Sequence, residues 1–205
     1  EEHVRVNQDP VRRYRMRLSD EPDPTIVNPS RLDAKASSQV CGYCHGMNMW
    51  KPIPLASGAR FHPGDDLRET RVILRASAKA AKSTDPLERK DWPALMQQLE
   101  GAMVDNPTLL EERFWPDGMV RVSGREHNGM IESKCFDGGN LSCLSCHSMH
   151  VSDSLDDQLA KDRLQDQACL QCHPRFGEDV EAHTHHARDS VGSRCQNCHM
   201  PHTVY

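Results

Sequence analysis

Four copies of one five-residue motif constrain this 205-residue chain more than any other feature of its sequence. Each copy is Cys-x-x-Cys-His, and together they use eight of the nine cysteines. The copies are Cys41-Gly42-Tyr43-Cys44-His45, Cys143-Leu144-Ser145-Cys146-His147, Cys169-Leu170-Gln171-Cys172-His173 and Cys195-Gln196-Asn197-Cys198-His199. The pattern is the signature of covalent c-type haem attachment, in which two thiols hold the porphyrin and the histidine is the proximal iron ligand. The sequence therefore predicts four covalently attached haems c.

Two other kinds of site, zinc sites and thiol redox sites, also use paired cysteines. Structural zinc sites pair two C-x-x-C knuckles, or one knuckle with distant histidines. Thiol redox sites use C-x-x-C alone. Neither chemistry needs a histidine directly after the second cysteine, and all four copies have one. The adjacency therefore favours haem.

Each haem iron has one further axial position, which the remaining histidines can fill. The candidates are His62, His127, His150, His183, His185, His186 and His202. His150 and His202 each follow a proximal histidine by three residues, a spacing that suits a neighbouring haem rather than the same one. His183 and His186 share one helical face, whereas His185 points elsewhere. Two axial histidines predict a low reduction potential, because an axial methionine raises it.

For the two histidines of the long insert, His62 and His127, the sequence favours neither haem ligation nor simple exposure to solvent. Methionine is the rival axial ligand, and nine are present. Those outside the motif regions are more simply explained as core filler. The ninth cysteine, Cys135, has no C-x-x-C partner, and we expect it to be buried and inert.

The composition is consistent with a protein in which the haems supply much of the apolar core. Hydrophobic residues make up 37% and aromatic residues 5% of the sequence, which is low for a globular domain. The net charge is −5 and no basic stripe stands out, which argues against a nucleic-acid partner. The sequence contains no apolar run long enough to form a transmembrane segment. No signal peptide is visible, yet haem is attached to this motif outside the cytoplasm, so we expect a periplasmic or extracellular location.

The spacing of the motifs divides the chain into three segments. Residues 1–28 contain several X-Pro pairs and are predicted to be an extended arm. Residues 29–142 hold the first haem site and a long insert. Residues 143–205 form a three-haem module in which Cys143, Cys169 and Cys195 follow one another at intervals of 26 residues. We expect the haems to link these segments into one domain.

The predicted fold is mainly α, with much irregular structure, a small β-hairpin or meander and a compact haem core. Helices are expected from Asn28 into the first motif, over 65–82, over 85–103, from Ser154 onward and over 178–188. Short strands are expected at 113–115, 119–123 and 130–135, with turns at Pro116–Gly118 and Asn128–Gly129.

The stretches Leu141–His150 and Cys195–His202 resemble multihaem cytochromes c with doubled C-x-x-C-H motifs, related to the tetrahaem electron carriers of ammonia oxidation. The stretch from Phe114-Trp115-Pro116-Asp117-Gly118 onward, through the histidine-rich Ala182–His186, is similar to multihaem proteins that often continue into helical repeat domains. The resemblance implies electron transfer through closely packed haems, frequently with two histidines per iron. It implies His45, His147, His173 and His199 as proximal ligands, with His150 and His202 as the doubled-motif ligands.

We therefore expect an electron carrier with no catalytic residues, which exchanges electrons with redox partner proteins or neighbouring cytochrome subunits. The sequence leaves open whether the chain assembles into homo- or hetero-oligomers. One alternative is a multihaem reductase of a small oxyanion, which needs one iron with an open axial position. Another is a protomer of a haem-bearing extracellular filament, which shares the electron-transfer role and differs in assembly.

Overall fold

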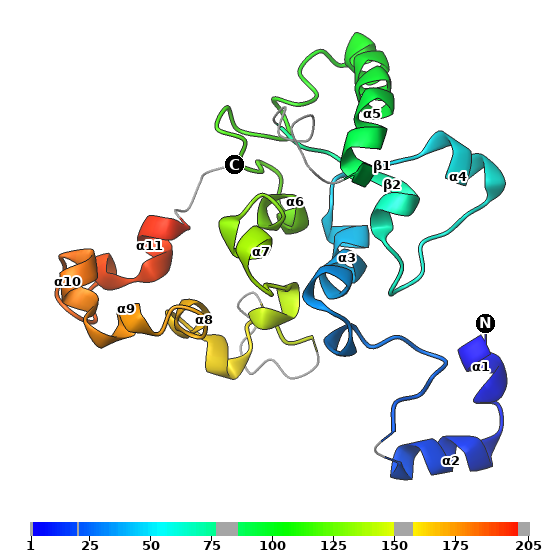
Figure 1. The fold of residues 1–205 in the computed structure, drawn as a ribbon, viewed down its shortest axis with the longest axis horizontal. Coiled ribbons are helices and arrows are strands. Elements are labelled where there is room, and N and C mark those ends of the chain that lie inside the picture. Colours follow the sequence, from blue (N-terminus) through cyan, green and yellow to red (C-terminus); the bar gives the residue numbers. More distant parts are fainter. Residues whose placement is uncertain (1, 20, 77–85, 150–157, 201–205) are drawn as a thin grey trace. The chain divides into compact units, whose positions relative to one another are not determined.

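The computed structural model describes residues 2–19, 21–76, 86–149 and 158–200 (Figure 1). The chain divides into two compact units, residues 1–140 and 141–205. This division lies close to the boundary expected before Cys143. The fold is mainly α-helical, with one small two-stranded antiparallel sheet. Within the described residues, no helix combines the length and the apolar character that crossing a membrane requires.

The N-terminal arm is helical, and the prediction of an extended arm is wrong. It contains α1 (Glu2–Val6) and α2 (Pro10–Leu18). Asp9 caps α2 by accepting a hydrogen bond from the Val11 N–H, and Pro10 occupies the first helical position. Proline fits that position because its missing N–H has no partner to lose there. The Asp9-Pro10 pair therefore starts a helix instead of breaking one.

A 3₁₀ turn, η1 (Pro29–Arg31), precedes α3 (Ala34–His45). Asp33 caps α3, with its carboxylate 2.8 Å from the Ala36 nitrogen. The helix ends on the histidine of the first motif. The prediction of a helix leading into this motif is confirmed, but the helix starts at a second cap rather than at Asn28.

The small sheet joins β1 (Asn48–Trp50) to β2 (Arg71–Ile73), with Met49 opposite Val72. Between them lie α4 (Pro52–Ser57) and the 3₁₀ turn η2 (Leu67–Glu69). The helix predicted over 65–82 is wrong for residues 65–76, and 77–82 lie outside the described residues. Val72 and Ile73 are β-branched and pair with a strand far away in the sequence, so the local helical pattern did not decide their structure.

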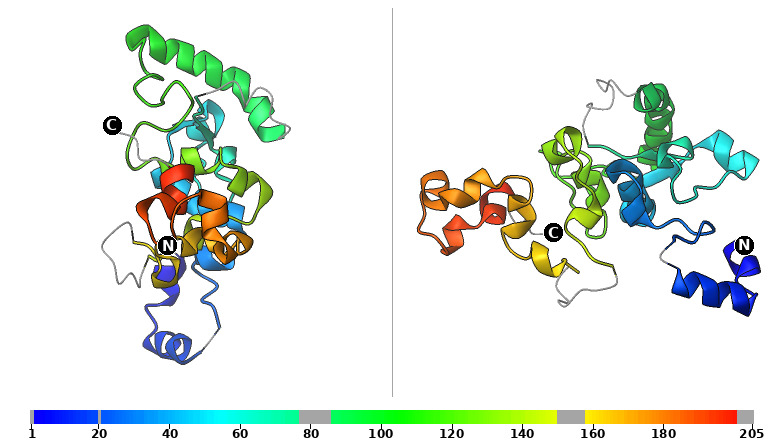
Figure 2. Two further views of the ribbon diagram at one scale, coloured as in Figure 1. Left: turned by 90° about the vertical axis from the view of Figure 1, so that its left-hand side faces the viewer. Right: turned by 60° about the horizontal axis from the view of Figure 1, so that its bottom comes forward.

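The hydrophobic core of the first unit forms around α5 (Pro86–Asp105), the long helix drawn in green in Figure 2. Leu95 and Leu99 are 1% and 2% exposed. They pack in a cluster with Met47, Leu74 and Phe114. The helix predicted over 85–103 is confirmed, and Pro93 lies inside it without ending it.

The predicted three-stranded meander is reduced to one bridge between Phe114 and Val120. The third predicted strand is wrong, because α6 (Glu126–Met130) and α7 (Lys134–Gly138) occupy that region. Ser133 caps α7 through its hydroxyl, which accepts from the Phe136 N–H. This cap gives the chain a local reason to turn into helix there.

The second unit consists of short helical turns joined by loops, coloured yellow to red in Figure 1. Its elements are η4 (Cys143–Ser145), η5 (Lys161–Arg163), α8 (Gln167–Leu170), α9 (Arg175–Glu178), α10 (Val180–Thr184), η6 (Val191–Ser193) and α11 (Cys195–His199). The helix predicted from Ser154 lies partly outside the described residues, and from residue 158 it is replaced by turns and these short elements. Among the described residues of this unit, no hydrophobic side chain is buried.

Candidate functional site: four Cys-x-x-Cys-His turns

Each Cys-x-x-Cys-His motif folds as a turn of helix. The first ends α3 and the fourth forms the whole of α11. In the second, the His147 N–H donates to the Cys143 carbonyl at 2.9 Å, and in the third His173 donates to Cys169 at 3.0 Å. Residues i, i+3 and i+4 of a helix share one side. Both thiols and the imidazole of each motif therefore face the same way.

The thiols are available for covalent attachment. All nine cysteines are unbridged. The second cysteine is exposed in three motifs, at Cys44, Cys172 and Cys198, and the other five motif cysteines are half-buried: Cys41, Cys143, Cys146, Cys169 and Cys195. The donor set of two unbridged thiols and one imidazole on one side fits a c-type haem. Among the described residues, no three His, Cys, Asp or Glu side chains gather as they would around a bare metal ion.

The ninth cysteine differs from the expectation. Cys135 is exposed on α7, so the prediction that it is buried is wrong. The helix spans only five residues and buries none of them, which leaves the thiol at the surface.

The three motifs of the second unit are hydrogen-bonded to one another. The Gln171 side chain, inside the third motif, donates to the Ser145 carbonyl inside the second at 2.9 Å. Asp166, just before the third motif, accepts from the Cys195 N–H of the fourth at 2.9 Å. Burial raises the pKa of the Cys195 thiol to about 11, and neighbouring Asp166 and Cys169 act in the same direction. The first cysteines of the third and fourth motifs are therefore close neighbours.

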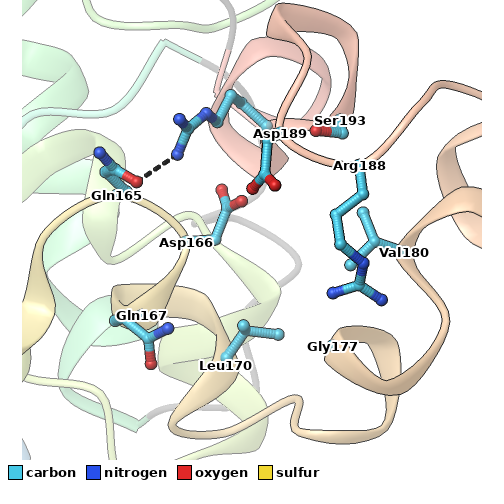
Figure 3. Close-up of a pocket in the computed structure, with 10 residues that line it drawn as sticks. Gln165, Asp166, Gln167, Leu170, Gly177, Val180, Arg188, Asp189 and Ser193 are labelled. Carbon is cyan, nitrogen blue, oxygen red and sulfur yellow. Dashed lines mark hydrogen bonds between the residues drawn. The ribbon is translucent and has the colours of Figure 1, made fainter.

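A small cavity lies beside this junction (Figure 3). Its volume is about 170 Å³, and Leu170, Gly177 and Val180 form part of its wall. Arg194 donates to the Gln165 side-chain oxygen at its edge. The cavity is smaller than the roughly 300–1,000 Å³ of typical ligand pockets. Most of its remaining wall is polar or charged, including Asp166, Arg188 and Asp189.

Among the described axial candidates, His183 packs beside a motif histidine. It sits on α10, with its ring centre 6.1 Å from that of His199 and the two ring planes 1° apart. Phe176 also contacts His183, with ring centres 4.5 Å apart, and its ring centre lies 6.2 Å from that of His173. The structure thus brings together one predicted axial histidine and the proximal histidine of the fourth motif.

The other histidines of that stretch take different positions. His185 ends α10 in the left-handed conformation, with φ 60°. His186 packs against Gly192, where an added Cβ would lie 2.5 Å from the imidazole Cγ. His150 and His202 lie outside the described residues.

The two insert histidines have opposite environments. His62 is 76% exposed, with its Nδ1 3.3 Å from Asp65 in a surface loop. His127 is 2% exposed, and neither ring nitrogen has a hydrogen-bond partner among the described residues. Burial, together with the charge of Arg75, lowers the pKa of His127 to about 4. The His127 ring is therefore neutral at neutral pH.

The first motif is held by His127, an axial candidate, and by Arg125 and Glu126, for which the sequence carried no signal. Arg125 donates to the Cys44 carbonyl at 2.9 Å, and Glu126 lies 3.4 Å from the His45 Nδ1. The His127 ring covers Gly42, where an added Cβ would lie 2.6 Å from the ring Cδ2. Both polar contacts span 81 residues, so no local pattern pointed to them.

No protein-family model, no curated protein and no solved structure matches this chain.

Proposed function

We propose that the protein is a tetrahaem c-type cytochrome that transfers electrons between redox partners in the periplasm or outside the cell. One observation carries the proposal: all four Cys-x-x-Cys-His motifs fold as helical turns whose cysteines are not in disulfides, with the two thiols and the imidazole on one side. Two thiols and one histidine are the groups that a c-type haem requires. Bound haem supplies an iron that alternates between the ferrous and ferric states.

The protein's own residues hold and order the four sites. The eight motif cysteines form the covalent attachments, and His45, His147, His173 and His199 are the proximal ligands. In the second unit, the bonds from Gln171 to Ser145 and from Cys195 to Asp166 tie consecutive motifs together. Short separations between redox sites suit a carrier, which needs no substrate pocket.

The pairing of His183 with His199 supports ligation by two histidines at the fourth site. Their ring centres lie 6.1 Å apart with planes 1° from parallel, so these two imidazoles are the pair that would hold the iron of the fourth site. His185, His186, His150 and His202 stay candidates for the remaining irons. The exposed position of His62 favours the solvated alternative for that residue.

The test is to express the chain in a host that matures c-type cytochromes and to count its haems. We expect four covalent haems per chain by mass and by the alkaline pyridine spectrum, all low-spin when oxidised. Replacing both thiols of one motif, as in Cys169→Ser with Cys172→Ser, should leave three. A chain that carries zinc or no haem would overturn the proposal. A high-spin haem that binds cyanide or nitrite would instead favour the reductase.

A further inference from the structure

The segment from Arg125 to Asn128 is hydrogen-bonded to the first motif and to backbone close to it in the fold. The Arg125 guanidinium donates to the carbonyls of Cys44 at 2.9 Å and of Gly124 at 2.8 Å. Asn128 accepts from the Met47 N–H at 2.6 Å and donates to the carbonyls of Met47 at 3.1 Å and Leu74 at 2.8 Å. These bonds fix the register of α6 against the end of α3. Glu126, between them, is therefore carried to a defined place.

That place is beside the proximal histidine of the first site. One carboxylate oxygen of Glu126, Oε2, lies 3.4 Å from the His45 Nδ1. The other, Oε1, accepts from the Gly124 N–H at 2.8 Å. Each oxygen thus has its own partner, and the carboxylate is held in place before any cofactor binds.

We propose that Glu126 is a positioning residue that orients His45 and lowers the reduction potential of the first haem. The inference rests on the proposed function, because it assigns His45 as an iron ligand. A hydrogen bond from Nδ1–H to the carboxylate fixes the tautomer and leaves the Nε2 lone pair free for the metal. The negative charge also makes the imidazole a stronger donor. A stronger donor stabilises ferric over ferrous iron, which lowers the potential.

The contact lies near the surface of the protein chain. The side chains of His45 and Glu126 are 62% and 69% exposed. An exposed pair of this kind contributes little to folding stability. Removing the Glu126 charge should therefore change the potential of one haem and leave the fold in place, which makes the effect measurable.

The experiment uses the four-haem protein and its Glu126→Gln variant. Glutamine keeps the size and an acceptor oxygen but removes the charge. We expect the midpoint of one haem to become more positive, with about a tenfold change in the ferrous-to-ferric ratio, or about 59 mV for one electron. Glu126→Asp should restore part of the shift. Glu111→Gln removes an exposed charge from the same unit and should leave all four midpoints unchanged.

The affected haem is identified in two ways. In a Cys41→Ser and Cys44→Ser background, the three-haem protein should show no effect of Glu126→Gln. In the four-haem protein, the paramagnetically shifted proton signals of the His45 ring should move. Unchanged midpoints and unchanged His45 signals in a four-haem Glu126→Gln protein would overturn this inference alone. Absence of haem from the unmodified chain would overturn the proposed function instead.

Discussion

The imidazole rings of His183 and His199 lie with centres 6.1 Å apart and planes 1° from parallel. The first belongs to α10 and the second ends the Cys-x-x-Cys-His turn of α11. They are sixteen positions apart in the sequence, and the loop through η6 connects them. The relationship gives the proposed ligation by two histidines one specific pair of residues to test.

Replacing His183 should therefore affect one haem. We expect His183→Ala to keep four covalent haems, because the thiols are untouched, and to convert one haem to a high-spin, cyanide-binding form. Loss of one of two histidine ligands should also raise that haem's potential. Electron paramagnetic resonance and a redox titration measure both effects. His62→Ala, at an exposed loop position, is the control, and a fully low-spin His183→Ala protein would contradict the pairing.

The exposure of Cys135 predicts how many thiols of the haem-loaded protein react with a thiol reagent. Eight cysteines carry haem in the proposed function, and Cys135 stands alone at the surface of α7. A thiol reagent should then modify one cysteine per native holoprotein chain, and none in the Cys135→Ser variant. Labelling followed by peptide mass spectrometry locates the site. Labelling at any motif cysteine would show incomplete haem attachment.

Gly42 and Gly101 should respond in opposite directions to alanine. A Cβ at Gly42 would lie 2.6 Å from the His127 ring, so Gly42→Ala should destabilise the first unit by about 1–3 kcal/mol. Gly101 lies in α5 with open space around it, so Gly101→Ala should stabilise by about 0.5–1 kcal/mol. Urea unfolding followed by tryptophan fluorescence measures both. His127→Ala should reduce the cost of Gly42→Ala in a double-mutant cycle, and purely additive effects would argue against the contact.

Asn128 is predicted to be the most sensitive polar residue of the first unit. Its side chain is 2% exposed and makes three hydrogen bonds to the backbone of Met47 and Leu74. Asn128→Ala leaves the Met47 N–H and the Leu74 carbonyl without a partner, whereas the Met47 carbonyl keeps its bond from the Leu74 N–H at 2.9 Å, so we expect a loss of about 2 kcal/mol or more. Asn128→Asp keeps the shape but points a buried carboxylate oxygen at two carbonyl oxygens, so it should cost more than Asn128→Ala. Denaturant midpoints rank the three proteins, and equal midpoints would exclude this role.

The N-terminal arm should loosen in acid. Hydrogen bonds from the Thr25 hydroxyl and N–H, followed by Asn7 and the charge of Arg12, lower the pKa of Asp23 from 3.8 to about 2. The ionised carboxylate therefore stabilises the arm fully above about pH 4, and this contribution is lost as the pH falls through about 2. Nuclear magnetic resonance signals of Thr25 should follow this transition. In Asp23→Asn the acid-dependent change should disappear, and its persistence would assign the transition to another group.

The sequence could predict the parts of the site that depend only on residues a few positions apart. Each motif places its two thiols and its imidazole by helical geometry alone, and the structure folds all four as turns. The helix leading into Cys41 was predictable for the same reason, since caps and apolar spacing are local. The stretch Ala182–His186 was recognisable by composition, although only the tertiary path showed that His183 meets His199.

The parts that sequence could not predict depend on distant partners. The helix expected over 65–82 gives way to β2 because Val72 pairs with Met49, more than twenty residues away. The strand expected at 130–135 gives way to α6, which Asn128 binds to the backbone of Met47, and to α7, which Ser133 caps locally. Glu126 carries no signal of its own, because a single glutamate beside an arginine is common on any surface. Its relation to His45 exists only once these long-range contacts have formed.

The contrast between the two units has a consequence for biogenesis. The first unit has its own apolar centre around Leu95 and Leu99, whereas no described hydrophobic side chain of the second unit is buried. A chain without an apolar centre lacks the main driving force of folding. We therefore expect the second unit to acquire a cooperative fold as its cofactors are attached, with thiols that stay reachable to the attachment machinery until that moment. Residues 141–205 would then fold only as their haems are attached, whereas residues 1–140 would fold first and receive their haem in a separate step.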